Sequence, residues 1–491
     1  MSLPGMRVIM FQRHRLLSET FSDKKAYNLK DLWNGEEKMG KELIFKSLRH
    51  EKTQRVPWVP FAGVHAGQLR GYTAEEMLTN ADNIVESLEE VAKLYMPDGM
   101  PVIFDLQIEA EILGCELLWA KDNPPSVKTH PLDSEKSIPC TCKFPSADSG
   151  RIPVVLEAMK RVKSSLGEEI ALYGLLCGPF TLASHLRGSS IFMDMVKDPE
   201  YVKDLIGYCG QAACRMADLY MKAGMDVIAV VDPLISQVSP KHIEKMMLET
   251  FTAVFDYIRS RERFSCFFVC GNASKQIEVM CKTGPDGISV DENVDLPKAK
   301  EITDRYNINI GGNIPLTTTM LHGTQEDNMK KVIDLMDSVS DHTNFIISPG
   351  CDMPYATPPE NTVACAQAVK NPERTRELIK NYQPEEIAHM DIEIPDYEAS
   401  EKVIIELFLL DPEQCAACTY MLAAVEDAYE DIKDMAEYQV YKYFIKEDIA
   451  RTAKMGVKNL PSICVNGDIR WISIIPSKEE LINVIKEYAG K

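Results

Sequence analysis

Two short stretches of the sequence decide the fold, and each is an apolar run that ends at a cysteine beside a glycine. The first is Phe267-Phe268-Val269-Cys270-Gly271-Asn272, and the second is Ser348-Pro349-Gly350-Cys351-Asp352. β-Branched and aromatic residues followed by a Gly or Asn break are typical of a buried strand that ends in a loop. Each stretch therefore predicts a strand that delivers its last side chain to a loop.

The sequence between the two cysteines alternates between strand and helix patterns. Residues 286–294 are expected to form a strand, 296–306 a helix and 308–313 the next strand. This alternation predicts parallel strands with crossover helices, whose ends converge on one face where sites are built. We therefore expect Cys270 and Cys351 to lie close together, as soft thiolate ligands suited to zinc.

The same alternation extends outward from this region over most of the chain. A first strand is expected at 58–61, and about eight strand–helix units follow one another up to roughly residue 380, the number that a closed (β/α)8 barrel needs. The expected organisation is an N-terminal extension at 1–40, the barrel at 41–380, an acidic linker at 381–400 and a second domain at 401–491.

Composition limits the classes of function. The 491 residues carry a net charge of −20, which argues against nucleic acid or an anionic membrane as a partner. No apolar run has the length of a membrane span, and the N-terminus lacks the apolar core of a signal peptide. The 14 cysteines are scattered as in a protein of a reducing compartment, so we expect a cytoplasmic protein.

The last part of the chain has its own pattern. A strand at 402–410 is followed by Cys415-Ala-Ala-Cys418 at the start of an expected helix, and Pro461 precedes a later strand. In this combination residues 401–491 resemble the thioredoxin/glutaredoxin superfamily. The resemblance implies that Cys415 attacks as a thiolate at the positive end of the helix, that Cys418 resolves the mixed disulfide, and that Pro461 is a cis-proline beside the pair. The alternative is a docking module.

Short motifs are spread over the expected barrel. They are Gly178-Pro-Phe-Thr-Leu-Ala183, Ala223-Gly-Met-Asp226, Asp232-Pro233, Cys270-Gly-Asn272, Asp291-Glu292, Gly311-Gly-Asn313 and Pro349-Gly-Cys351. With them, residues 41–380 resemble the uroporphyrinogen decarboxylase superfamily, and more closely its corrinoid- and zinc-dependent methyltransferases. The resemblance implies a (β/α)8 TIM barrel that moves a methyl group between a small methylated compound or thiol and a cobamide on a separate corrinoid protein.

The resemblance also implies roles for single residues. Cys270 and Cys351 match two zinc ligands of the methyltransferases, but Phe268 occupies the position of their histidine and cannot bind a metal. His65 or Asp291 is expected to complete the set, and both are expected to contact substrate together with Asn272. The alternative is that metal binding is lost and the two cysteines are simply buried.

The decarboxylase activity of the superfamily is not expected. Asp105 matches its essential aspartate, but Pro60 and Val64 replace the two arginines that bind the porphyrinogen carboxylates. Two alternatives to methyl transfer stay open, a decarboxylase of a different substrate and a redox-regulated binding or sensor protein built on the same barrel.

Overall fold

The computed structural model describes residues 40–384, 390–410 and 416–490, and Gly40–Lys491 form one compact unit. Most of the expected N-terminal extension lies outside the described residues. So do Cys415 and part of the expected linker.

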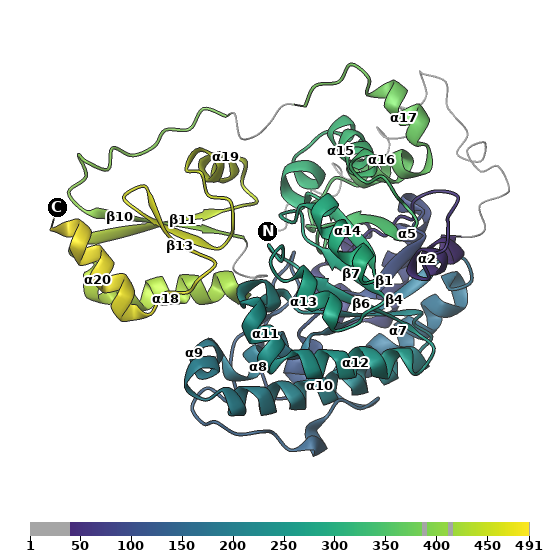
Figure 1. Ribbon diagram of the computed structural model, residues 1–491, viewed down its shortest axis with the longest axis horizontal. Helices are drawn as coiled ribbons and strands as arrows, with labels where there is room; N and C mark the ends of the chain where they lie inside the picture. Colours follow the sequence, from purple (N-terminus) through teal and green to yellow (C-terminus); the bar gives the residue numbers. More distant parts are fainter. Residues whose placement is uncertain (1–39, 385–389, 411–415, 491) are drawn as a thin grey trace, which may run out of the picture. The chain divides into compact units, whose positions relative to one another are not determined.

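A sheet of seven parallel strands forms the centre of the first part of the chain, in the order β1-β4-β5-β6-β7-β8-β9. Figure 1 shows the sheet with helices such as α10 and α12 along its outer side. The strands are β1 (Gly99–Ile103), β4 (Ala171–Cys177), β5 (Val227–Val231), β6 (Phe264–Val269), β7 (Gly287–Val290), β8 (Asn309–Ile314) and β9 (Phe345–Pro349).

A short extended segment joins the two edges of this sheet. Trp58 bridges Ile347 of β9 in parallel, and the amide of Val59 donates to the Ile347 carbonyl at 3.0 Å. On the other side, the carbonyl of Trp58 accepts from the amide of Asp98, just before β1, at 2.9 Å. The curled sheet is thus consistent with the expected TIM-like barrel. The strand expected at 58–61 is reduced to a single bridge, because the flanking prolines have no N–H to donate.

Helices follow the strands along the chain, and several begin at side-chain caps. Asn80 accepts from the amides of Asp82 and Asn83 at the start of α5, for example. The helices are α2 (Gly40–Leu48), α3 (Gly63–Gln68), α4 (Ala74–Leu78), α5 (Ala81–Tyr95), α6 (Ile108–Ile112), α7 (Ile152–Leu166), α8 (Pro179–Arg187), α9 (Ser190–Lys197), α10 (Pro199–Lys222), α11 (Pro240–Met246), α12 (Leu248–Arg259), α13 (Ile277–Lys282), α14 (Leu296–Arg305), α15 (Gln325–Ser338), α16 (Pro359–Lys370) and α17 (Pro372–Leu378), with short helical turns η2 (Thr141–Lys143), η3 (Pro233–Gln237) and η4 (Leu316–Leu321). A two-stranded hairpin, β2 (Leu117–Leu118) and β3 (Ser126–Val127), lies between α6 and α7.

Strand β6 packs on both of its faces. Phe267 contacts Phe251 and Phe255 of α12, with ring centroids 4.7 and 5.4 Å away. Phe268 points to the opposite face, as the pleat requires, and contacts Phe61 and Phe104 at 4.8 and 5.9 Å. The second group belongs to the apolar interior enclosed by the sheet, against which Cys270 and Cys351 also pack.

The last part of the chain, from β10 to α20, which we call the C-terminal domain, contains a four-stranded mixed sheet in the order β11-β10-β12-β13, in which β10 and β11 are parallel. Figure 1 places α18 and α20 on one side of this sheet and α19 on the other. Its Leu460–Pro461 peptide bond is cis, as predicted. The elements are β10 (Val403–Leu409), α18 (Ala416–Ile432), β11 (Ala436–Lys442), α19 (Lys446–Lys454), β12 (Ser462–Val465), β13 (Asp468–Ile472) and α20 (Lys478–Ala489).

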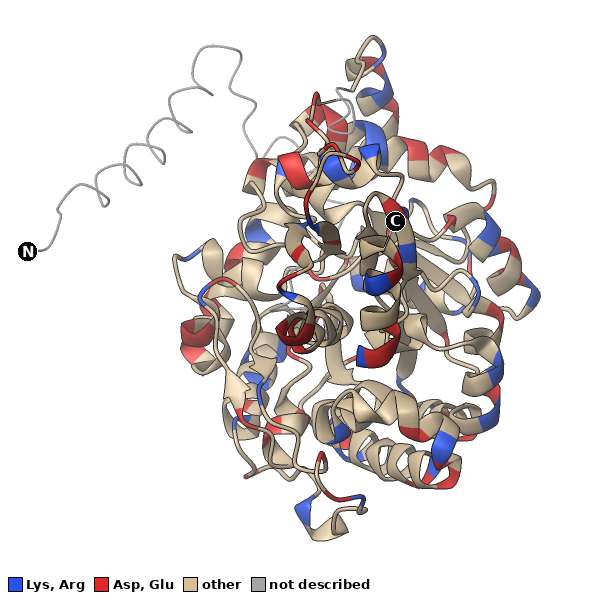
Figure 2. Ribbon diagram, turned by 90° about the vertical axis from the view of Figure 1, so that its left-hand side faces the viewer, with Lys and Arg blue, Asp and Glu red and all other residues tan. Residues whose placement is uncertain are grey.

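The charged residues do not form one continuous patch on the face shown in Figure 2, where acidic and basic residues are interspersed along the helices. Within the described ranges, no helix combines the length and apolar character needed to cross a membrane.

Candidate functional site

Side chains that follow the barrel strands gather at one end, which we call the strand-end face. It is defined by Asp105, Asp232, Cys270, Asp291 and Cys351, which come directly or almost directly after β1, β5, β6, β7 and β9. Binding and catalytic groups of such barrels sit at this end.

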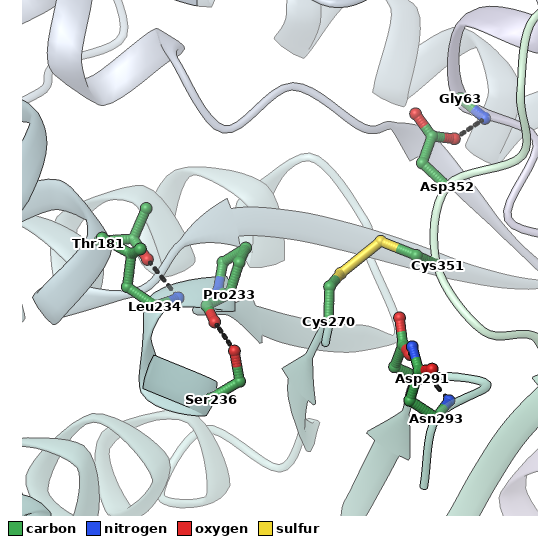
Figure 3. Close-up of a disulfide and its surroundings, with 10 residues drawn as sticks. All are labelled: Gly63, Thr181, Pro233, Leu234, Ser236, Cys270, Asp291, Asn293, Cys351 and Asp352. Carbon is green, nitrogen blue, oxygen red and sulfur yellow. Dashed lines mark hydrogen bonds between the residues drawn. A yellow bond between two sulfur atoms is a disulfide. The ribbon is translucent and has the colours of Figure 1, made fainter. Parts of the chain in front are cut away.

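Cys270 and Cys351 meet at this face, as the sequence predicts. They form a disulfide across a sequence separation of 81 residues, with Cα atoms 5.9 Å apart (Figure 3). Both residues are partly exposed. A disulfide presents no thiolate, so this pair must be reduced before either sulfur can act as a nucleophile or metal ligand.

Aromatic side chains occupy the interior below the two sulfurs. Phe268, two residues before Cys270, is fully buried against Phe61 and Phe104. Residues two apart on a strand share a face, so the Phe268 ring lies on the same side of β6 as Cys270. The position expected for a third metal ligand is therefore apolar.

The loop that carries Cys351 is tied to the start of α3. The amide of Gly63 donates to the Asp352 carboxylate at 2.8 Å (Figure 3). A Cβ on Gly63 would lie 2.4 Å from that carboxylate, so a larger residue here would displace the Asp352 side chain. Burial raises the pKa of Asp352 well above its usual value. This contact fixes the Cys351 loop beside the segment that bears His65.

His65 is buried on α3 with both ring nitrogens engaged. Nδ1 lies 3.0 Å from the Tyr355 carbonyl oxygen, and Nε2 lies 2.6 Å from the Tyr95 hydroxyl. Burial lowers the pKa of His65 to about 4, so the ring is neutral and donates from Nδ1 while Nε2 accepts. In this conformation neither nitrogen is left for a metal or substrate, and the predicted binding role of His65 stays a prediction.

Asp291 lies beside the Cys270 loop. Its carboxylate accepts from the amide of Asn293 at 2.9 Å (Figure 3). It also accepts from the amide of Gly271. Burial raises its pKa. Its neighbour Glu292 accepts from the amide of Leu316, and burial together with the Asp291 charge raises the pKa of Glu292 to about 8. A carboxyl with that pKa can exchange a proton with a thiol near neutral pH. The sequence motif contains Glu292, but only the structure reveals that this residue is partly buried beside Asp291.

Asp105 is buried at the end of β1 in an ion pair that the sequence does not predict. Arg151 Nη1 donates to its carboxylate at 2.6 Å, and Arg151 Nε donates to Glu111 at 2.8 Å. The guanidinium also lies 4.9 Å from the ring centroid of Trp119. Nη2 of Arg151 and Oε2 of the nearby Glu109 are buried without a hydrogen-bond partner among the described residues. These two atoms are available to a polar group entering this side of the strand-end face.

Glu109 gives a pH-dependent prediction. Burial raises its pKa to about 8, although Oε1 accepts from the amide of Cys177 at 3.0 Å. The folded chain thus binds this proton more tightly than the unfolded chain. Its contribution to stability is fully present below about pH 4.3 and is lost as the pH rises to about 8. Between these pH values we expect the free energy of unfolding of Glu109→Gln to fall by about 2 kcal/mol less than that of the wild-type protein. Urea titrations at several pH values measure this difference. An unchanged pH dependence would contradict this.

Asp232 has a structural task at the same face. Its carboxylate accepts from the Phe180 amide at 2.8 Å and from the Thr181 hydroxyl at 2.5 Å, at the start of α8. A Cβ on Gly178 would lie 2.3 Å from Asp232, so this position needs glycine. These contacts explain the Gly178-Pro-Phe-Thr motif as an anchor of α8.

The remaining predicted residues lie on the C-terminal domain or contact it. Cys418 is buried in the first turn of α18, and Pro461 directly precedes β12, whereas Cys415 lies outside the described residues. Asn272 donates from Nδ2 to Asn459 Oδ1 at 2.7 Å, and its own Oδ1 accepts from Ser274. In this conformation the Asn272 amide is engaged by the C-terminal domain.

The residues at the strand-end face do not complete the expected zinc site. Cys270 and Cys351 supply two sulfurs, and Phe268 supplies no ligand. His65 is engaged on both nitrogens, and the Asp291 carboxylate already accepts from the amides of Asn293 and Gly271. Over the parts of the chain that the structure describes, no group of three or more His, Cys, Asp or Glu residues is arranged to hold a metal ion. The donor set therefore falls short of the three protein ligands of a catalytic zinc site.

Residues 39–372 match the family model of uroporphyrinogen decarboxylase (URO-D). Two similar curated proteins illustrate its branches. The Methylcobamide:CoM methyltransferase MtbA of Methanosarcina acetivorans is 29% identical over 337 residues, covering 67% of this chain and 97% of MtbA. The uroporphyrinogen decarboxylase of Wolbachia pipientis is 27% identical over 305 residues, covering 60% of this chain and 86% of that protein.

A solved structure, described as a methyltransferase from Methanosarcina mazei, has the same fold. It superposes with a TM-score of 0.61 at 24% identity, over 68% of this chain and 98% of its own. The family match ends before the C-terminal domain, so the comparisons bear on the barrel.

Proposed function

The chain belongs to the uroporphyrinogen decarboxylase family, and from that premise we propose that it is a methyltransferase acting between a corrinoid protein and a thiol or small methylated compound. The observation that carries the proposal is the meeting of Cys270 and Cys351 at the strand-end face, from strands 81 residues apart. The names of the two similar MtbA methyltransferases, which align with 67% of this chain against 60% for the decarboxylase, support it.

The decarboxylase alternative is less well supported. Pro60 and Val64 stand where porphyrinogen-binding arginines are expected, and both are buried. A substrate with many carboxylates needs guanidinium groups of this kind. Arg151 is already paired with Asp105 and Glu111, which neutralise its charge. A decarboxylase of a smaller substrate remains the second candidate, because Asp105 and Arg151 lie together at the strand-end face.

In the proposed reaction the cobamide of the partner protein supplies the methyl group. The residues of this chain prepare the thiol that accepts it. Thiols react as thiolates, so a proton must leave. We assign its acceptance to the carboxyl pair Asp291 and Glu292, because burial raises both pKa values and brings that of Glu292 to about 8, close to the pKa of a thiol. The rings of Phe61, Phe104 and Phe268 form an apolar surface below Cys270 and Cys351, and this surface excludes water from that side of the proposed site. We derive no step through zinc, because the ligand set is incomplete.

For the C-terminal domain we propose a thiol–disulfide redox role carried by Cys415 and Cys418, with Pro461 beside them. The order of its elements, in which α18 follows β10 and the Pro461 loop precedes β12, supports a thioredoxin-like domain. A redox-regulated sensor without methyl transfer would keep this domain and the disulfide but would leave the Asp291–Glu292 pair without a task.

The proposal is tested by incubating reduced full-length protein with methylcobalamin and 2-mercaptoethanesulfonate. We expect methylcobalamin to be consumed and the methyl thioether to form at least about 100-fold faster than without protein. That increase corresponds to an activation free energy lower by about 3 kcal/mol. Absorbance and mass spectrometry report the two events. Decarboxylation of uroporphyrinogen by the same preparation, with no methyl transfer to any tested thiol, would contradict the proposal.

A further inference from the structure

We propose that Cys140 and Cys142 form a reversible dithiol–disulfide pair that reacts with an amino acid disulfide held in a groove beside them. The two cysteines lie in the long connection between β3 and α7, on either side of Thr141 at the start of the turn η2. They are not part of the strand-end face, and the proposal depends neither on methyl transfer nor on the C-terminal domain.

Exposure separates Cys140 and Cys142 from the other thiols that the structure describes. Both residues are exposed. Burial raises the pKa of Cys214 to about 11 and that of Cys115 to about 12, so almost none of these two thiols is ionised near neutral pH. Among the described thiols, Cys140 and Cys142 are the ones that a small disulfide in solution can reach. The buried or half-buried thiols of the described ranges are Cys115, Cys177, Cys209, Cys214, Cys266, Cys281, Cys365, Cys418 and Cys464.

The backbone of the turn brings the two cysteines together. The amide of Lys143 donates to the Cys140 carbonyl at 3.0 Å and closes the turn. The amide of Cys142 donates to the Cys140 sulfur at 3.2 Å, and the two sulfurs lie close enough together to bond. Residues two apart have Cα atoms at most about 7 Å apart, and a turn shortens this distance into the range of disulfides. The pair can therefore open and close with little movement of the backbone.

The same hydrogen bond gives the two sulfurs different tasks. An N–H group that points at a sulfur stabilises the thiolate more than the thiol. Cys140 receives such a bond from the amide of Cys142, so we assign the attack on an incoming disulfide to Cys140. Cys142 is left to resolve the mixed disulfide, and its place two residues away gives its sulfur a high effective concentration.

Contacts with α10 hold the turn in place. The hydroxyl of Tyr208 donates to the Cys140 carbonyl at 3.3 Å, and the ring of Phe144 packs on that of Tyr208 with centroids 4.8 Å apart. These contacts leave both cysteines exposed. The turn therefore presents its two sulfurs in one arrangement, on the layer of helices outside the barrel sheet to which α10 belongs (Figure 1).

A groove of about 510 Å³ lies between this turn and the helices α10 and α12. Thr141, which separates the two cysteines, lines the groove, so both cysteines stand at its edge. A volume of this size suits a small ligand. The lining carries charges of both signs, because Lys203 pairs with Glu249 at 3.4 Å and Asp204 also lines the groove. Such a lining favours a ligand that carries both ammonium and carboxylate groups, as an amino acid disulfide such as cystine does.

The exchange balances in two steps. The Cys140 thiolate attacks one sulfur of the disulfide RSSR, a Cys140–SR bond forms, and RS⁻ leaves with the electron pair of the S–S bond. The Cys142 thiolate then attacks the Cys140 sulfur, and the second RS⁻ leaves. The two released thiolates take up the two protons that the cysteines lost. The protein pair is oxidised by two electrons, RSSR is reduced to two RSH, and a dithiol reverses the reaction.

Peptide mapping of the full-length protein tests the pair. Trypsin releases residues 137–143 as one peptide that contains both cysteines. The protein is reduced, freed of reductant, incubated with cystine and quenched with acid. We then expect this peptide to contain an internal disulfide and to resist alkylation until a dithiol is added. In Cys142→Ser the reaction should stop at a mixed disulfide between Cys140 and cysteine. Two alkylatable thiols in the wild-type peptide, or no mixed disulfide in Cys142→Ser, would overturn the proposal.

Rates of oxidation test the groove. We expect Lys203→Ala to slow oxidation by cystine about threefold more than oxidation by the uncharged bis(2-hydroxyethyl) disulfide, because a charge that binds the ligand is lost. The matched control Lys241→Ala, which changes an exposed lysine on α11, should alter neither rate. Equal effects of Lys203→Ala on the two disulfides would refute the binding role of the groove. These readouts do not involve methyl transfer, so they can fail while the proposed function holds, and the reverse.

Discussion

Oxidised protein is expected to form the methyl thioether more than about 100-fold more slowly than reduced protein, a difference of about 3 kcal/mol in the barrier. The reason is the chemistry of the strand-end face. A thiol acceptor that enters there meets the Cys270–Cys351 disulfide and undergoes exchange with it, giving a mixed disulfide instead of a thioether. Only the dithiol form leaves the acceptor free to take a methyl group.

The measurement compares the two redox forms of one preparation. Each form receives one equivalent of the acceptor thiol, because an excess of that thiol would itself reduce the disulfide. The reduced form is first treated with a phosphine that is then removed, and thioether formation from methylcobalamin is followed in both. Cys214→Ser is the control, since it lacks a cysteine remote from the strand-end face and should respond to reduction as wild type does. Equal thioether formation by both redox forms would contradict the prediction.

The sequence predicts the parts of the fold that depend on periodicity. The apolar run before Cys270 predicts β6, because a continuous apolar run is typical of a strand whose two faces are both covered. All six residues of β6 are buried or half-buried. The meeting of Cys270 and Cys351 follows from parallel topology, in which strand ends share one face. The expected strand at 58–61 is shorter than predicted, because two prolines remove donors that a ladder needs.

Partnerships within the site could not be predicted in the same way. Nothing local to His65 indicates that Tyr355 and Tyr95, from distant segments, engage both of its nitrogens. The pairing of Arg151 with Asp105 joins the residue before α7 to the segment after β1, and it likewise depends on tertiary packing. Formation of the disulfide depends on redox state as well as on geometry. The pattern of residues therefore predicts that the two sulfurs lie close together, but it does not predict whether they are bonded.

The substitution Phe268→His is expected to create the zinc site that the present residues leave incomplete. An imidazole at position 268 would lie on the same side of β6 as Cys270 and would add a nitrogen ligand to the two sulfurs. We expect the reduced variant to bind one zinc ion per chain at least about 100-fold more tightly than reduced wild-type protein, a gain of about 3 kcal/mol. Competition with a chromophoric chelator measures this affinity.

The matched control is Phe267→His, one residue earlier on the same strand. Both phenylalanines are fully buried among other aromatic rings, so either change should lower the free energy of unfolding by about 2–4 kcal/mol. The His at position 267 would face Phe251 and Phe255 of α12, away from the sulfurs, and should add no zinc affinity. Tight zinc binding by reduced wild-type protein, or equal gains in both variants, would show that Phe268 is not what leaves the ligand set incomplete. A gain confined to Phe268→His, and lost again when Cys270→Ser is added, would mean that one aromatic side chain separates this strand-end face from a three-ligand metal site.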